Sequence, residues 1–168
     1  AQKIDGIVVD ARVPKAYITA ELAAFSPNGD GIKDTQKLSI VTNVNDGLAS
    51  WSVAIKAEGA AANATPVKAW SSSDAASSGK PAALPAAINW DGKDSSGAAV
   101  SGKYTATLSL TWVKGDTVTV STPSFLVNPK APVLGVKLTP KYFSPDNDGI
   151  DDELFINLSA ASLSSFTE

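Results

Sequence analysis

The sequence predicts an all-β protein folded as an antiparallel β-sandwich. Three observations lead to this prediction. Several short segments alternate between apolar and polar residues, the pattern of a strand with one buried face. Clusters of Gly, Asn, Asp, Ser and Pro separate these segments and indicate turns. The acidic residues are 13 Asp against 4 Glu, a bias toward the residue that favours turns and away from the one that favours helices.

The first two strands are expected on either side of a turn. In Gln36–Val44 the residues Leu38, Ile40 and Thr42 fall on one face, and Ser50–Lys56 alternates in the same way around Val53. The intervening Asn-Asp-Gly sequence is a strong turn signal. We therefore expect these two strands to pair as a hairpin.

The middle of the chain is expected to hold a short edge strand, a loop and one long strand. Pro66–Ser71 has the apolar residues of a short strand, and 74–85 is rich in Ser, Ala, Gly and Pro, as a loop is. Lys103–Trp112 has the clearest alternation, because every second residue of it is apolar. The residues of this apolar face are Tyr104, Ala106, Leu108, Leu110 and Trp112.

The last strands of the full unit follow a tight turn at Lys114-Gly115. Thr117–Ser121 returns along the long strand, and Pro123 interrupts it before Phe125–Val127. Because proline cannot donate a ladder hydrogen bond, we expect an edge position or a bulge there. Roughly five to seven strands over about 115 residues favour an immunoglobulin-like sandwich, here without the cysteine pair of antibody domains.

A sequence repeat with an offset of 118 residues (143 minus 25) organises the chain. Phe25–Asp34 recurs as Phe143–Asp152, and the same offset carries Pro14 onto Pro132 and Leu38 onto Ile156. We therefore expect one unit of a tandem array. Residues 1–13 would be the last strand of a preceding unit, 14–130 a complete sandwich, and 131–168 the truncated start of a following repeat. The alternative is one larger domain whose two ends are related by duplication.

The truncated repeat is expected to leave apolar strand residues such as Leu154, Ile156 and Leu158 exposed. The nearest candidate partner for them is the leftover N-terminal strand Ile4–Val9.

Composition limits the possible chemistry. The 168 residues include no His and no Cys, which excludes Cys–His nucleophiles, the Ser–His–Asp triad and the common zinc sites. A net charge of −3 gives no electrostatic reason to expect nucleic acid. No run approaches the roughly 20 apolar residues of a membrane helix, so no membrane insertion is expected in this segment. The chain begins with Ala and no leader follows, so we expect a processed or excised piece.

Two loops carry a family resemblance. The first is Ser26–Asp34, which together with the preceding Phe25 begins Phe-Ser-Pro-Asn-Gly-Asp-Gly and, after two further residues, ends in Asp. The second is Trp90–Gly97, followed by Val100, Gly102 and Tyr104. The first resembles the opening of bacterial Ig-like modules of secreted and surface proteins, including the C-terminal modules of gliding-motility-type proteins. The second resembles the Ig-like domain of the flagellar hook-capping (FlgD-type) protein. The resemblance covers about residues 14–130 and implies an Ig-like fold.

The second loop is interpreted as a turn rather than a catalytic site. Trp90 would place its indole in the core at a strand end, and Asp91 and Asp94 would accept hydrogen bonds from nearby backbone N–H groups. Gly92 and Gly97 would supply positive φ angles. Paired catalytic carboxylates would need a cleft and a substrate platform, and the sequence indicates neither. No catalytic residue and no cofactor-binding residue is therefore expected.

The first loop and its repeat have two possible roles. Their side chains place oxygen atoms at alternate positions, and Ca²⁺ prefers oxygen ligands. The loops do not match an EF-hand, because Ser26 and Ser144 fall where its first Asp should be. The alternative is a turn built by Asx and Gly residues. The candidate calcium ligands are Asn28, Asp30 and Asp34 in the first loop and Asp146, Asp148 and Asp152 in its repeat.

Together these features favour a non-catalytic structural or adhesion module of a bacterial extracytoplasmic or surface repeat protein. Its partners would be another protein or the neighbouring Ig-like repeats. Two alternatives stay open: an assembly scaffold like the flagellar hook cap, and an accessory module of a surface enzyme whose catalytic domain lies outside this chain.

Overall fold

The computed structural model describes residues 11–74, 83–131 and 133–161. The chain divides into two compact units, Ala1–Pro129 and Lys130–Glu168, which are described separately. All regular elements of the described residues are strands, and none of these residues forms a helix that could cross a membrane. The strand expected at Ile4–Val9 lies outside the described residues.

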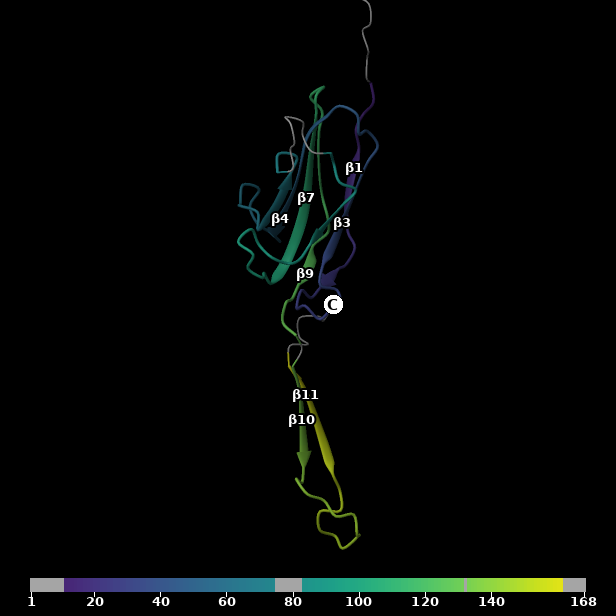
Figure 1. Cartoon of the computed structure of the whole chain (residues 1–168), viewed down its shortest axis with the longest axis vertical. Coiled ribbons are helices and arrows are strands. Elements are labelled where there is room, and N and C mark those ends of the chain that lie inside the picture. Colours follow the sequence, from purple (N-terminus) through teal and green to yellow (C-terminus); the bar gives the residue numbers. More distant parts are fainter. Residues whose placement is uncertain (1–10, 75–82, 132, 162–168) are drawn as a thin grey trace, which may run out of the picture. The chain divides into compact units, whose positions relative to one another are not determined.

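The first unit consists of two sheets (Figure 1). The smaller sheet has the antiparallel order β1 (Ala16–Ala20), β3 (Gln36–Thr42), β6 (Ala87–Trp90). The larger sheet has the order β2 (Ala24–Phe25), β9 (Phe125–Val127), β7 (Gly102–Trp112), β4 (Leu48–Ala57), β5 (Lys68–Ser71), with β8 (Thr117–Ser121) also on β7. The pairs within the larger sheet are antiparallel, except that β2 runs parallel to β9.

The core lies between the two sheets, as the alternation of the strands predicts. Along β7 every second side chain is buried, from Tyr104 to Trp112. The other sheet contributes the buried Leu38 and Ile40 of β3, and β4 contributes Val53 and Ile55, both 0% exposed. Each sheet thus turns its apolar face to the other. The all-β sandwich predicted from the sequence is confirmed.

The predicted pairing of β3 with β4 is wrong. β3 pairs with β1 and β6, whereas β4 pairs with β5 and β7 in the other sheet. The Asn-Asp-Gly turn therefore crosses from one sheet to the other. Val44 is buried at the start of this crossing, and its carbonyl accepts the indole N–H of Trp112 at 3.2 Å. A turn signal predicts that the chain reverses, but burial of two apolar faces decides which strands pair.

The edge features follow the prediction. Among the described strands β5 pairs with β4 alone, so it lies at the edge of its sheet. β8 and β9 follow each other along the same edge of β7, and the interruption near Pro123 is a bulge. There the Thr122 N–H donates to the Ala106 carbonyl at 2.9 Å, while the Ala106 N–H donates to the Thr122 hydroxyl at 3.1 Å. The threonine side chain thus replaces a missing backbone acceptor.

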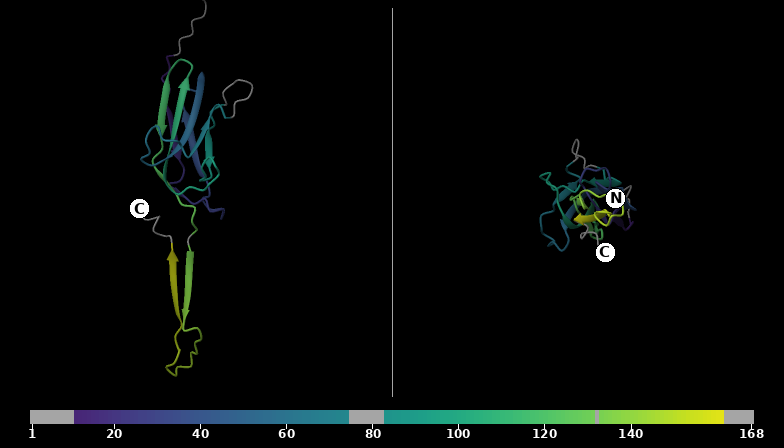
Figure 2. Two further views of the ribbon diagram at one scale, coloured as in Figure 1. Left: turned by 90° about the vertical axis from the view of Figure 1, so that its left-hand side faces the viewer. Right: turned by 90° about the horizontal axis from the view of Figure 1, so that it is seen from below.

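The second unit is an antiparallel hairpin of β10 (Val133–Thr139) and β11 (Phe155–Ala161), joined by a loop (Figure 2). Its register repeats that of β1 and β3. In the first unit Ile18 pairs with Ile40, and adding 118 to each number gives Val136 and Leu158, which are paired in the second. The sequence repeat is therefore also a repeat of strand pairing.

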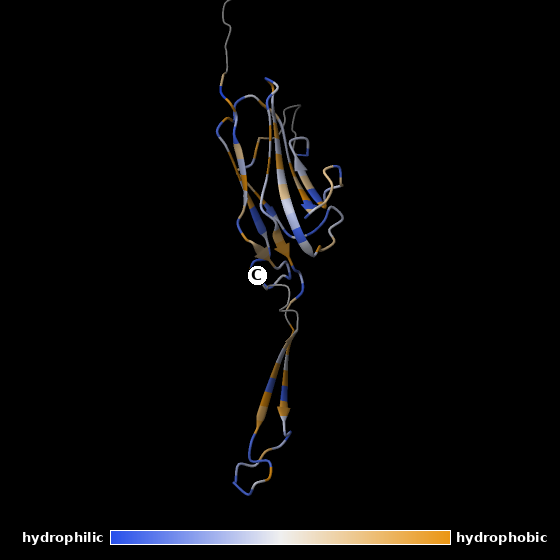
Figure 3. Cartoon of the chain, turned by 180° about the vertical axis from the view of Figure 1, so that it is seen from behind, coloured by the Kyte–Doolittle hydropathy of each residue, from blue (hydrophilic) through white to orange (hydrophobic). Residues whose placement is uncertain are grey.

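The two copies differ in burial. Ile18, Leu38 and Ile40 are at most 5% exposed in the first unit, but their counterparts Val136, Ile156 and Leu158 are 65%, 61% and 77% exposed. Hydrophobic residues run along both strands of the hairpin (Figure 3). The predicted exposure is confirmed for Ile156 and Leu158, while Leu154 is half-buried. The suggested pairing with Ile4–Val9 lies outside the described residues.

Candidate functional site

The first Asp-rich loop, Ser26–Asp34, lies between β2 and β3 and is held by its own carboxylates. Both oxygens of Asp34 accept backbone N–H groups, from Gly29 at 2.8 Å and Gly31 at 2.7 Å. Asp30 accepts the N–H of Ile32 at 2.8 Å. Hydrogen bonds to the ionised form, the largest from Gly29, lower the pKa of Asp34. These carboxylates therefore build the turn.

The repeated loop, Ser144–Asp152, has the same hydrogen bonds. Asp152 accepts the N–H groups of Asn147 at 2.8 Å and Gly149 at 2.7 Å, and Asp148 accepts that of Ile150 at 2.8 Å. The backbone angles repeat too, since Asn147 takes a φ of 65° where Gly29 takes 82°. Asparagine is one of the few residues that tolerate this left-handed conformation. The Asx and Gly turn is thus the structure of both loops.

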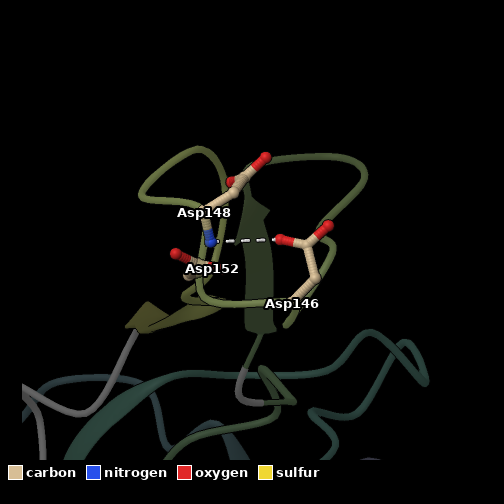
Figure 4. Close-up of side chains that lie close together, drawn as sticks. All are labelled: Asp146, Asp148 and Asp152. Carbon is tan, nitrogen blue, oxygen red and sulfur yellow. Dashed lines mark hydrogen bonds between the residues drawn. The ribbon is translucent and has the colours of Figure 1, made fainter.

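The repeated loop Ser144–Asp152 also brings three carboxylates together. Oxygen atoms of Asp146, Asp148 and Asp152 all lie within 4.8 Å of one another, and the Asp148 N–H donates to Asp146 at 3.3 Å (Figure 4). In the first loop Asn28 takes the place of Asp146, and its side-chain amide donates to Asp30 at 3.1 Å. The repeated loop Ser144–Asp152 therefore has a set of oxygen ligands that suits Ca²⁺ better than that of the loop Ser26–Asp34. An exposed acidic cluster also occurs without a metal, so calcium binding at either loop stays a prediction.

Trp90 lies in the core at the end of β6, as predicted. Its side chain is 0% exposed and its indole N–H donates to the Lys93 carbonyl at 2.7 Å. The ring packs edge-on against Phe25 and Tyr104, each at a centroid distance of 5.6 Å, and against Phe125 at 6.0 Å. The indole thus joins both sheets and fixes the start of its loop.

Asp91 and Asp94 form the predicted Asx turns. One oxygen of Asp94 accepts the N–H and the hydroxyl of Ser96, at 2.8 and 2.7 Å, and the N–H of Ala98 at 2.9 Å. Asp91 accepts the N–H of Lys93 at 3.2 Å. The Ser96 hydroxyl is the largest cause of a lowered pKa at Asp94. A general acid needs the opposite shift, so this geometry favours turn building at Asp94.

The structure brings the two motif loops into contact, which the sequence did not predict. A Cβ atom added to Gly92 would lie 2.5 Å from Cγ of Pro27 and 3.4 Å from the ring of Phe25. Gly92 also has a φ of 69°. Only glycine fits this contact, because it has neither the Cβ atom nor the conformational penalty. The residue spacing within each loop gives no sign of such a contact between loops that are distant in sequence.

A surface hollow of about 420 Å³ lies on the outer face of β4 and β7. Ser52, Thr107, Ser109 and Thr119 contribute hydroxyl groups to it, and Lys56 contributes a charge. No Asp or Glu lines this hollow, so it does not bring together the paired carboxylates of a hydrolase.

Comparison of the sequence with protein-family models and with curated proteins gave no match.

Proposed function

We propose that the chain is a non-catalytic Ig-like structural or adhesion module of a bacterial extracytoplasmic repeat protein. One observation carries the proposal: the 118-residue repeat preserves the pairing register of two strands and the hydrogen bonds of the loop between them. Such fidelity is expected when one structural unit is duplicated along a chain. The module would act as a spacer and scaffold whose first partners are the neighbouring repeats.

The polar loops support a structural role. Their carboxylates accept hydrogen bonds from groups of the same loops, and these bonds lower the pKa values of Asp34, mainly through the Gly29 N–H, and of Asp94, mainly through the Ser96 hydroxyl. Hydrogen bonds of this kind favour the ionised form of Asp34 and Asp94 and stabilise the turns that these residues form. A flagellar hook-cap-like scaffold and an accessory module of a surface enzyme are the alternative proposals. The gene on either side of this segment distinguishes them, since further repeats favour the spacer and a catalytic domain favours the accessory module.

The proposal is tested by activity and by location. Purified protein is expected to give no turnover of peptide or glycan substrates above the buffer rate. Turnover that Asp91→Asn abolishes would contradict the non-catalytic role. Protease treatment of intact source cells is expected to remove the protein, with a cytoplasmic enzyme as the protected control. Resistance of the protein to the protease until the cell envelope is opened by lysis would contradict surface exposure.

A further inference from the structure

The hairpin of β10 and β11 has one apolar face. Directly opposed residues of an antiparallel pair share a face, so Val136 lies beside Leu158 and Leu138 beside Ile156. All four are more than half exposed. The intervening residues on the other face include Lys137 and its partner Asn157 at the centre, with Val133 and Phe155 at the two ends. The hairpin thus has the pattern of a sheet that is covered on one side, although an isolated two-stranded hairpin is only marginally stable in water.

The first unit shows what covers the equivalent face. There β1 and β3 pack against β4, β7 and β9, whose core residues include Val53, Ile55, Leu108 and Leu110. In addition, β6 pairs with β3 at Gln36–Ser39. The equivalent residues of β11 pair only with β10 among the described residues. Among the described residues of the second unit there is thus no counterpart of the covering sheet or of the edge strand β6.

Two coordinated residue differences between the copies of the repeat indicate that the apolar face of the hairpin is suited to burial. In the first unit Gln36 is 0% exposed, its side-chain oxygen accepts the Leu22 N–H at 2.9 Å, and its amide donates to the Leu22 carbonyl at 2.5 Å. The offset of 118 places Pro140 and Leu154 at these two positions. Proline has no N–H, so the buried acceptor is no longer needed there. An apolar leucine replaces it, which suits a buried site rather than a surface one.

The face of the hairpin that carries Val136, Leu138, Ile156 and Leu158 is called its inner face below. We propose that this inner face of the β10–β11 hairpin is the docking surface for the second half of an Ig-like sandwich. This occupant corresponds to residues 44–129 and belongs to the same repeat as the hairpin, so the inference rests on the proposed repeat function. A second copy of the chain does not offer that surface, because its β4–β7–β9 sheet is already covered by its own β1 and β3.

The test extends the chain in register. Residue 44 plus 118 is 162, so residues 44–129 are joined directly after Ala161 in place of 162–168. Amide exchange of β10 and β11 is expected to slow at least about tenfold relative to the natural chain, because exposed hydrogen bonds become part of a cooperative core. Binding of a hydrophobic dye to the hairpin should fall in parallel.

Matched variants of the extended chain locate the effect. Val136→Asp places a charge on the inner face and should abolish the added protection, whereas Asn157→Asp changes the outer face and should retain it. A further variant carries the residues of the first unit, Leu134→Ala, Pro140→Leu and Leu154→Gln, which match the appended half-sandwich most closely. It keeps the test informative if the natural hairpin fits that half poorly.

Two results would overturn the proposal. One is unchanged exchange and dye binding in both the extended chain and its triple variant. The other is a natural chain that sediments as a dimer with the hairpin amides already protected, since the occupant would then be a second copy. Neither result concerns catalysis or location, and conversely turnover by the purified protein would leave the exchange result intact. Failure of this inference and failure of the proposed function are therefore distinguishable.

Discussion

Replacing Trp90 by phenylalanine tests whether the Trp-Asp-Gly loop is anchored by its indole. The change removes the 2.7 Å hydrogen bond to the Lys93 carbonyl, worth about 1 kcal/mol. It also removes a net two carbon atoms from a side chain that is 0% exposed, at about 0.8 kcal/mol each. Together these losses lower the free energy of unfolding by about 2.5 kcal/mol. That is a large part of the roughly 5–15 kcal/mol that stabilises a domain.

Urea unfolding followed by far-ultraviolet circular dichroism measures this loss. The midpoint should fall while the dependence on urea stays constant, because the surface exposed on unfolding hardly changes. Trp70→Phe is the matched control, since Trp70 is half-buried on the edge strand β5 and should cost less than about 1 kcal/mol. Equal losses for the two variants would refute the assignment of Trp90 as the anchor of the loop.

Three further predictions follow from the loops. Gly92→Ala should destabilise the protein by about 1–3 kcal/mol more than Gly115→Ala. Both glycines have positive φ, but only at Gly92 does the added Cβ meet a proline ring, and equal thermal midpoints would contradict the contact. Asp34 and Asp94 have lowered pKa values in the folded state, so their stabilisation is complete above the pKa of the unfolded chain and is lost as the pH falls through the lower folded values. Acid titration of the melting midpoint should show a smaller acid-side loss in Asp94→Asn than in the natural protein, and identical profiles would exclude Asp94 as a contributor. Calcium is expected to slow amide exchange in the loop 144–152 relative to a chelator, and the effect should disappear in Asp148→Ala; no change with calcium would exclude the site.

Local features that depend on neighbouring residues could be predicted from the sequence. The alternation of Lys103–Trp112 is the burial pattern of β7, and the proline after Ser121 marks a bulge. The 118-residue offset anticipates the register shared by the two hairpins. The Asx turn at Asp94 follows from residue types that accept nearby N–H groups. The bounds of the short strands β1 and β6 cannot be predicted from the sequence, because four or five residues give too little alternation to identify a strand.

Pairing and contact between distant segments were decided only by the tertiary structure. The turn after Val44 suggested a hairpin, yet β3 and β4 lie in opposite sheets because each must bury one apolar face against the other. The same closure seats Gly92 against Pro27 and joins two loops that are separate in the sequence. The same packing distinguishes the first copy from the second. The strand alternation is the same in both, but among the described residues only the first copy has a second sheet that buries its apolar face. Alternation specifies which face of a strand is apolar, but burial depends on the sheet that packs against it.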